Sequence, residues 1–352
     1  MPMQTLYLSE QYSIVKREGE ALRVEIPEDQ QLGRQRQVVR VPLNVIERVV
    51  VQGEITLTAS ALACLLERRI CTHFLSYSGR SQGALTPDPT RNASLRLAQY
   101  AAHTSIQHRF SLARTFVDGK LRNLRTQILR FNRSQREPTL TQAIERLRDA
   151  HRDLHGLSIP EYVDPLDRMH GMGQILGCEG QGSAAYWDCW GMLLNQPWEW
   201  HGRRRRPPPD PVNALLSYGY VILTSQVLSQ LAIVGFDPYI GFLHQSSFGK
   251  PALALDLMEE FRPVIVDSVV LTVLNTKILN QQHFQREPGS VQLSKEGRKL
   301  FLTKLEERFS SEIQHPIFGY RVSYRRCIEL QARLLAKALM GEIQHYIPFL
   351  VR

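Results

Sequence analysis

Carboxylates lie in an otherwise apolar stretch of the C-terminal half. The segment LALDLMEEF carries Asp256 and Glu259, and burying an ionised carboxylate is costly unless a counter-charge, hydrogen bonds or a metal ion compensates it. His244 precedes them in GFLHQSSFGK, and Glu179 is the acid of GCEGQGSAAYW. Asp256 and Glu259 are three residues apart, so both can point the same way if their segment is helical.

One imidazole with two or three carboxylates is a ligand set for Mg²⁺ or Mn²⁺. In phosphodiester chemistry such an ion can polarise a phosphoryl oxygen, activate a hydroxyl and stabilise the leaving oxygen. A structural interpretation stays open, because a histidine after a turn is commonly satisfied within the fold and Asp-x-x-Glu commonly caps a helix. The sequence therefore yields two alternatives for these four residues, a metal site or purely structural contacts.

The first ninety residues read as strands. LYLSEQYSIVKREGEALRVEIP alternates apolar and polar residues around a turn at Gly19, and QVVRVPLNVIERVVVQGEITLT continues in the same style. SALACLLERRI has helical spacing, CTHFLSYSGR returns to a strand, and LTPDPTRN is typical of a linker. We expect an α+β fold: a small N-terminal β-rich domain at residues 1–87, a linker at 88–92 and a larger all-α catalytic domain at 93–352.

Helical spacing dominates the rest of the chain. SLRLAQYAAHTSIQHRFSLARTFVDGKLRNLRTQILRFNR keeps it over a long span, SQREP breaks it, and TLTQAIERLRDAHRDLHGL begins another helix with Thr139 or Thr141 as its cap. MGQILGCEGQGSAAYWDCWGMLL reads as a helix containing Gly180 and Gly182. Because glycine inside a helix costs about 1 kcal/mol, both indicate a close approach to the backbone. A long apolar helix is expected at residues 212–231.

The positive charge is concentrated in one region. The net charge is +9, yet residues 1–90 hold ten basic and ten acidic residues, whereas residues 91–138 hold ten basic residues against Asp118 and Glu137. A helical projection places four arginines within an arc of roughly 140°: Arg122, Arg125, Arg130 and Arg133. This footprint indicates a polyanion partner such as nucleic acid. A solvated helix face without a partner is the alternative.

Composition restricts the class of protein. With 352 residues and 43% apolar composition, the chain is long enough for about two globular domains. The start lacks a signal-peptide pattern, and the run VIVDSVVLTVL is interrupted by Asp267 and too short for a bilayer, so we expect a soluble cytoplasmic protein. Five cysteines without CxxC spacing indicate buried thiols rather than disulfides or a zinc finger.

Several blocks in order resemble a known family. They are LARTFVDGKLRNLRTQILR, GCEGQGSAAYW, DPVNALLSYGY, GFDPYIGFLHQSSFGKPALALDLMEEFRP, LSKEGRKLFLTKLEERF and ARLLAKALMGEIQHYIPF. Together they resemble the CRISPR-associated adaptation integrase, the "Cas one" subunit that inserts new spacers. The resemblance implies a homodimer formed through the N-terminal part, a divalent metal ion held by Glu179, His244 and Glu259, and a supporting acid at Asp256. It also implies a small partner subunit, "Cas two", that bridges two dimers.

The resemblance implies a reaction as well. A 3′-hydroxyl on a short double-stranded DNA would attack a phosphodiester at the edge of a repeat, a transesterification in which the protein supplies positioning and charge stabilisation. Candidate phosphate contacts are Lys120, Arg122, Arg125, Arg203, Arg204, Arg205, Arg206, Arg262 and Lys277. Arg262 has an equal alternative, a structural salt bridge to Glu259 or Glu260.

Two rival functions use the same residues differently. One is a nuclease for branched DNA or RNA that integrates nothing, and the other is a nucleic-acid-binding scaffold with a decayed site, which the intact set of four residues disfavours. Tyr218 and Tyr220 of LSYGY raise a covalent tyrosine nucleophile as a further alternative. We favour packing for both, because tyrosines on an apolar helix are commonly core residues or hydrogen-bond donors.

Overall fold

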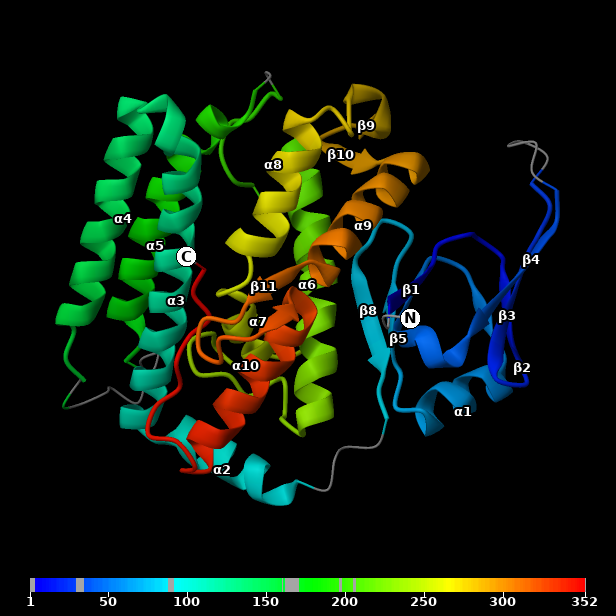
Figure 1. Cartoon of the computed structure of the whole chain (residues 1–352), viewed down its shortest axis with the longest axis horizontal. Helices are drawn as coiled ribbons and strands as arrows, with labels where there is room; N and C mark the ends of the chain where they lie inside the picture. Colours follow the sequence, from blue (N-terminus) through cyan, green and yellow to red (C-terminus); the bar gives the residue numbers. More distant parts are fainter. Residues whose placement is uncertain are drawn as a thin grey trace. The chain divides into compact units, whose positions relative to one another are not determined.

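The computed structural model describes residues 4–29, 35–87, 92–159, 161, 171–195, 198–204 and 207–351. The chain divides into two compact units, Met1–Thr90 and Arg91–Arg352 (Figure 1). The expected linker at residues 88–92 lies outside the described residues except for Asn92, so its boundaries stay a prediction. The expected order, strands first and helices afterwards, is confirmed.

The first unit contains two four-stranded sheets and helix α1 (Ala59–Glu67). Its strands are β1 (Gln4–Leu8), β2 (Ile14–Glu18), β3 (Ala21–Ile26), β4 (Gln37–Pro42), β5 (Ile46–Gln52), β6 (Thr56–Leu57), β7 (Cys71–Leu75) and β8 (Ser81–Leu85). One sheet has the order β1-β5-β7-β8, in which only β8 is antiparallel to its neighbour. The other has the order β4-β3-β2-β6, an antiparallel meander with β6 parallel to β2.

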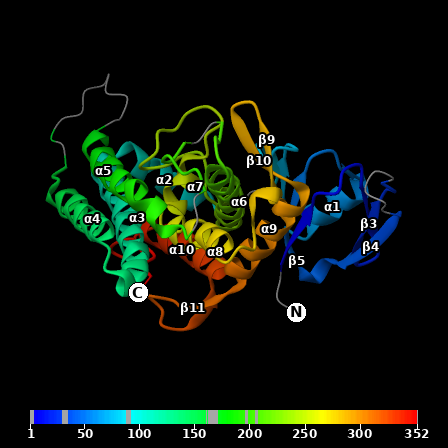
Figure 2. The same ribbon diagram turned by 90° about the horizontal axis from the view of Figure 1, so that it is seen from above.

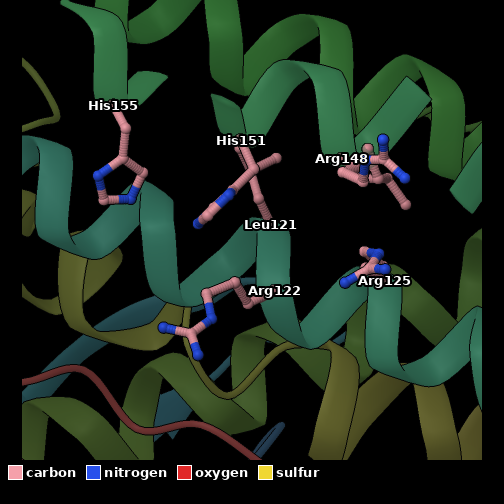
Figure 3. Close-up of a pocket in the computed structure, with 7 residues that line it drawn as sticks. Leu121, Arg122, Arg125, Arg148, His151 and His155 are labelled. Carbon is pink, nitrogen blue, oxygen red and sulfur yellow. The ribbon is translucent and has the colours of Figure 1, made fainter. Parts of the chain in front are cut away.

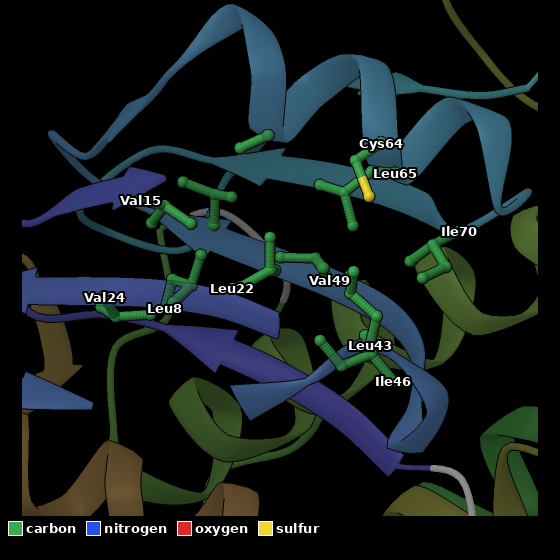
Figure 4. Close-up of a cluster of buried hydrophobic side chains, with 12 residues drawn as sticks. Leu8, Val15, Leu22, Val24, Leu43, Ile46, Val49, Cys64, Leu65 and Ile70 are labelled. Carbon is green, nitrogen blue, oxygen red and sulfur yellow. The ribbon is translucent and has the colours of Figure 1, made fainter. Parts of the chain in front are cut away.

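An apolar core holds this unit together. Leu8 and Val49 from the first sheet meet Val15 and Leu22 from the second, beneath Leu65 of α1 (Figure 4). Strand β5 is buried along almost its whole length, as expected for a central parallel strand covered on both faces.

The second unit is built mainly from helices. These are α2 (Ala93–Thr104), α3 (Ile106–Gln135), α4 (Pro138–Gly156), α5 (Gly173–Cys189), α6 (Pro211–Val234), α7 (Ala252–Met258), α8 (Ser268–Asn275), α9 (Lys295–Ser310) and α10 (Tyr324–Leu339). Helices α3, α4 and α5 pack against one another, and α6 packs against α7, α8 and α10 (Figures 1 and 2). A π-helical turn (Pro263–Asp267) joins the segment after α7 to α8.

The expectation of an all-α second domain is wrong in detail. Two short hairpins interrupt the helices, β9 (Phe284–Glu287) with β10 (Ser290–Leu293), and β11 (Glu312–Gln314) with β12 (Arg321–Ser323). Each hairpin turns through a glycine with positive φ, Gly289 at 76° and Gly319 at 75°, a conformation that other residues adopt only with strain. Strands of three or four residues are too short to give a clear alternation in sequence.

Helix boundaries also differ from expectation in two places. The long span after Asn92 is two helices, because Ser105 adopts an extended conformation and its hydroxyl caps α3 at the His108 N–H. Helix α4 begins at Pro138 with Glu137 as the residue before it, so the predicted caps Thr139 and Thr141 are wrong. Proline suits the first helical position, where its missing N–H costs nothing.

The predicted positions of two further helices agree with the structure. Helices α5 and α6 occupy the expected segments. A Cβ at Gly182 would collide with Leu121 of α3, whereas a Cβ at Gly180 would meet nothing within 4 Å. Close approach to the backbone is therefore confirmed at Gly182 and wrong at Gly180. All five cysteines are buried and free, as predicted.

Helix α6 is the one described helix long and apolar enough to cross a membrane by length and composition. Its apolar window is 56% buried inside the unit, which is the behaviour of a core helix. The helix begins at Asp210, whose carboxylate accepts the Asn213 N–H at 2.8 Å, and ends at Gly235 in the left-handed conformation.

Candidate metal centre

The structure brings the four predicted site residues together, and a fifth, Lys120, pairs with two of them, Glu179 and Glu259. Glu179 lies in the middle of α5, His244 in the loop that follows α6, Asp256 on α7, and Glu259 directly after α7. Lys120 reaches Glu179 and Glu259 from α3. Four segments distant in sequence therefore supply one site.

The Lys120 ammonium lies between two carboxylates. Lys120 is buried, pairs with Glu179 Oε1, and places its Nζ 2.9 Å from Glu259 Oε2. Burial alone would lower the pKa of Lys120, but Glu259 and Glu179 outweigh it and hold that pKa above its ordinary value. Ser183, one turn along α5, donates its hydroxyl to Glu179 Oε1 at 2.8 Å.

Both carboxylates are ionised in this setting. Burial acts to raise the pKa of Glu259, but Arg262, Lys120 and His244 lower it to about 2. The pKa of Glu179 is likewise below its ordinary value, because Lys120 and Ser183 outweigh the effect of burial. The buried charge of Glu259 is thus compensated by Arg262 and Lys120, which answers the question raised by its burial in an apolar segment.

Asp256 has a different function in the fold from Glu259. Its fully buried carboxylate accepts the backbone N–H groups of Phe242, Leu243 and His244 at 2.5, 3.0 and 2.8 Å. The same carboxylate lies 2.7 Å from Nδ1 of His244. Gly241 is needed beside it, because a Cβ there would lie 2.7 Å from Asp256 Oδ2. Asp256 therefore fixes the loop that carries the histidine.

This contact determines which nitrogen of His244 faces the site. Nε2, the nitrogen away from Asp256, lies 3.9 Å from Glu259 Oε1 and carries the lone pair when the imidazole is neutral and Nδ1–H donates to Asp256. Metal-binding histidines in proteins are typically oriented in this way by a carboxylate on their other nitrogen.

The donor set fits a divalent ion. Two ionised carboxylates and a neutral imidazole nitrogen suit Mg²⁺ or Mn²⁺. Glu259 Oε2 is buried and accepts no hydrogen bond of acceptable geometry, although Lys120 Nζ is near it. An ion at this position would require the long side chain of Lys120 to move. Glu179, His244 and Glu259 are the residues that could then hold the ion.

The comparison with known proteins identifies the family. The model of the family described as "CRISPR associated protein Cas1" matches residues 6–307 of the chain. The chain belongs to the Cas1 family. A relative named CRISPR-associated endonuclease Cas1 3, from Thermus thermophilus, is 35% identical over 347 residues, covering 99% of this chain and 97% of the relative.

Solved structures share the Cas1 fold. A casposase bound to integration product has a TM-score of 0.82 at 21% identity, covering 98% of this chain and 93% of the casposase chain. A Cas6-RT-Cas1–Cas2 complex has a TM-score of 0.79 at 24% identity, covering 99% of this chain and 36% of the matched chain. At these identities the likeness concerns the fold alone.

Arg262 of this Cas1 family member forms the structural salt bridge that was one of its two alternatives. Its guanidinium lies 3.3 Å from Glu259 Oε1 and stacks over the ring of Tyr220, 4.8 Å from the centroid. Tyr220 donates to Asp267 Oδ1 at 2.6 Å. Burial raises the pKa of both Tyr218 and Tyr220 above the ordinary value, which disfavours a phenolate nucleophile and agrees with the expectation of packing.

The other predicted phosphate contacts are dispersed. Lys120 is buried in the site and is not on the exposed basic face. Arg122 is exposed and Arg125 half-buried on α3, while Arg204 and Lys277 are exposed. Arg203 turns inward and donates to Asn213 Oδ1 at 2.7 Å. Arg205 and Arg206 lie outside the described residues.

A second group of metal-competent side chains was missed in the sequence. Asp118, His151 and His155 each place one ligand atom within 4.8 Å of the others. The available signal was the spacing of the two histidines, four residues apart in AHRDLH, which puts them on one helix face. In the sequence, Asp118 stands out only as one of two acids among ten basic residues.

Proposed function

We propose that this Cas1 family member is a metal-dependent DNA integrase and endonuclease of CRISPR spacer acquisition. In the proposed reaction the 3′-hydroxyl of a short DNA attacks a phosphodiester at the edge of a repeat. One observation carries the proposal: three separate segments bring Glu179, His244 and Glu259 together, with both glutamates paired to the buried Lys120 and His244 Nε2 3.9 Å from Glu259 Oε1.

Each residue has a defined part in this proposal. Glu179, His244 and Glu259 would hold Mg²⁺ or Mn²⁺, which when bound polarises a phosphoryl oxygen and favours deprotonation of the attacking hydroxyl. Asp256 orients His244 through Nδ1 and holds the loop by three backbone hydrogen bonds. Arg262 and Lys120 keep Glu259 ionised. The Glu259 carboxylate could therefore bind a metal ion without first losing a proton.

The proposed partners follow from charge and from the relatives. The basic surplus of residues 91–138 and the exposed Arg122, Arg204 and Lys277 supply candidate contacts for double-stranded DNA phosphates. The casposase of similar fold is bound to integration product, and another structure of similar fold contains Cas2. We extend this to a homodimer formed through the N-terminal unit, bridged by a Cas2 subunit, in the cytoplasm.

A plasmid assay tests the reaction. The protein and a Cas2 subunit are mixed with supercoiled plasmid carrying a repeat, Mn²⁺ or Mg²⁺, and a labelled duplex with free 3′-hydroxyls. Label joins the plasmid with the natural protein, whereas His244→Ala and a 3′-dideoxy duplex give no joined product. His283→Ala is the matched control and joins normally, because His283 only caps a short turn at Asn280.

The rival functions are separate outcomes of the same assay. Plasmid that is nicked without gaining label would replace the integrase by a nuclease. Retained DNA binding with no turnover in either metal would favour a scaffold. Full joining by His244→Ala would remove the metal assignment whatever the reaction.

A further inference from the structure

A second site lies between α3 and α4, on the face of α3 away from Lys120. Asp118 and Arg122 are each two residues from Lys120, a rotation of about 200° on a helix, so they point away from the metal centre. Here the structure has a pocket of about 450 Å³. It is lined by Leu121, Arg122, Arg125, Leu147, Arg148, His151 and His155 (Figure 3).

Three ligand atoms converge beside this pocket. His151 Nε2 lies 2.6 Å and His155 Nε2 2.9 Å from the same atom, Asp118 Oδ1. The histidines are one turn apart on α4, with ring centroids separated by 4.6 Å. Asp118 is buried while His155 is exposed, so the cluster has an anchored carboxylate and an open side.

We propose that Asp118, His151 and His155 bind a borderline transition-metal ion, with Zn²⁺ the first choice. Imidazole nitrogens favour Zn²⁺ over Mg²⁺, and three protein ligands with one open position are a common arrangement for an exchangeable zinc ion. At Zn–N and Zn–O distances near 2 Å, tetrahedral ligand atoms are about 3.3 Å apart. The present contacts of 2.6 and 2.9 Å need to open by less than about 1 Å.

Arg122 is compatible with this ion. Its guanidinium lies 3.6 Å from the other carboxylate oxygen, Asp118 Oδ2, and half of its side chain is exposed. Oδ1 is therefore available as the ligand while Arg122 orients the carboxylate from Oδ2, a role that second partners of metal ligands commonly have.

The open position faces a basic pocket. Among the described residues Arg125 has no recorded ion-pair partner, and its Nε is buried without a hydrogen bond. With Arg148 and Arg122 in the same pocket, the fourth ligand of the ion is expected to be an anion such as phosphate or, in its absence, water. The site is independent of the proposed integrase reaction, because it shares no ligand with Glu179, His244 or Glu259.

Zn²⁺ binding to the whole protein tests the site. Isothermal titration with Zn²⁺ alone, after removal of metal by chelation, is compared between the natural protein and His155→Gln. The variant is expected to bind one Zn²⁺ fewer, or to bind it at least tenfold more weakly, whether or not the Glu179 centre also takes zinc. His155 is more than half exposed, so this variant folds.

Two controls make the result decisive. His108→Gln removes another exposed histidine of the same region, one that contacts Ser105, and leaves the zinc stoichiometry unchanged. Asp118→Asn lowers the zinc affinity like His155→Gln. The proposal fails if His155→Gln binds zinc with the stoichiometry and affinity of the natural protein, or if the natural protein binds no zinc at micromolar concentration.

Discussion

Lys120 Nζ lies 2.9 Å from Glu259 Oε2 and also pairs with Glu179. An ammonium thus fills the space between two carboxylates that would otherwise repel each other in a buried site. A divalent ion there would carry twice the charge and would have to displace this lysine. Lys120 therefore compensates the two carboxylates in this structure and, under the proposed metal assignment, would compete with the ion.

Replacing Lys120 by methionine separates these two effects. Removing one partner of a buried ion pair costs about 3–5 kcal/mol, so Lys120→Met is expected to melt well below the natural protein in EDTA. Mn²⁺ then raises the melting temperature of the variant more than that of the natural protein. Lys16→Met is the control, since the Lys16–Glu25 pair lies at the surface and solvent screens such pairs strongly. Equal melting in EDTA would show that Lys120 is not the counter-charge.

The carboxylates of the centre were visible in the sequence, whereas their partner was not. A charged residue within LALDLMEEF conflicts with its apolar surroundings, so the need for compensation is a local signal. Lys120 is 59 residues from Glu179, and its place depends on how α3 packs against α5. In the sequence it looks like one more cation of a basic helix, and it was predicted to contact phosphate.

Helix boundaries that depend on tertiary contacts were likewise not predictable from the sequence. The interruption at Ser105 has no proline or glycine to announce it, since a serine hydroxyl caps α3 there. The apolar periodicity predicted both ends of α6 to within a few residues, because most of that helix is buried. Periodicity reports burial, whereas the positions of breaks and hairpins depend on tertiary contacts.

Asp256→Asn is expected to weaken metal binding more than folding. The amide can still accept hydrogen bonds through its oxygen, but its NH₂ group faces donors that now contact the carboxylate. His244 loses its orienting partner. Because loss of such a partner typically lowers metal affinity about 10–100-fold, we expect the Mn²⁺ affinity to fall by about this factor. Mn²⁺ titration measures it.

The matched control for this change is Asp237→Asn. Asp237 lies in the same loop as His244. It accepts hydrogen bonds from the Tyr239 N–H and from the Tyr100 hydroxyl of α2, and none of its hydrogen bonds involves His244. It should leave Mn²⁺ affinity unchanged. Equal losses in both variants would mean that loop stability, and not the orientation of His244, controls the site.

Two glycines of α5 should respond in opposite ways to alanine. Gly182→Ala forces a Cβ into Leu121, and overpacking a buried contact typically costs about 1–3 kcal/mol. Gly180→Ala meets open space and gains helix propensity, about 0.5–1 kcal/mol. Chemical denaturation of both variants measures the change in the free energy of unfolding, which should fall for Gly182→Ala and rise for Gly180→Ala. A stabilised Gly182→Ala would contradict the close contact between α3 and α5.

Glu260 has the opposite protonation behaviour to its neighbour Glu259. Its carboxyl group accepts hydrogen bonds from the Tyr346 hydroxyl, the Gln331 side chain and the Phe349 N–H, all in the C-terminal part of the chain. Burial raises the pKa of Glu260 to about 8, although these donors oppose the shift. Glu259 therefore stays ionised near neutral pH, while Glu260 holds its proton.

This raised pKa predicts a pH dependence of stability. A group whose folded pKa lies above its unfolded value, 4.5 for this carboxyl, contributes stability that is fully present below pH 4.5 and is lost as pH rises towards 8. Glu260→Gln cannot ionise, so the stability of the natural protein relative to the variant should fall between pH 5 and pH 8 and level off above pH 9. Urea denaturation at each pH measures this difference. A difference that is constant from pH 5 to 9 would show that Glu260 is ionised in the folded protein, its charge compensated by the three donors.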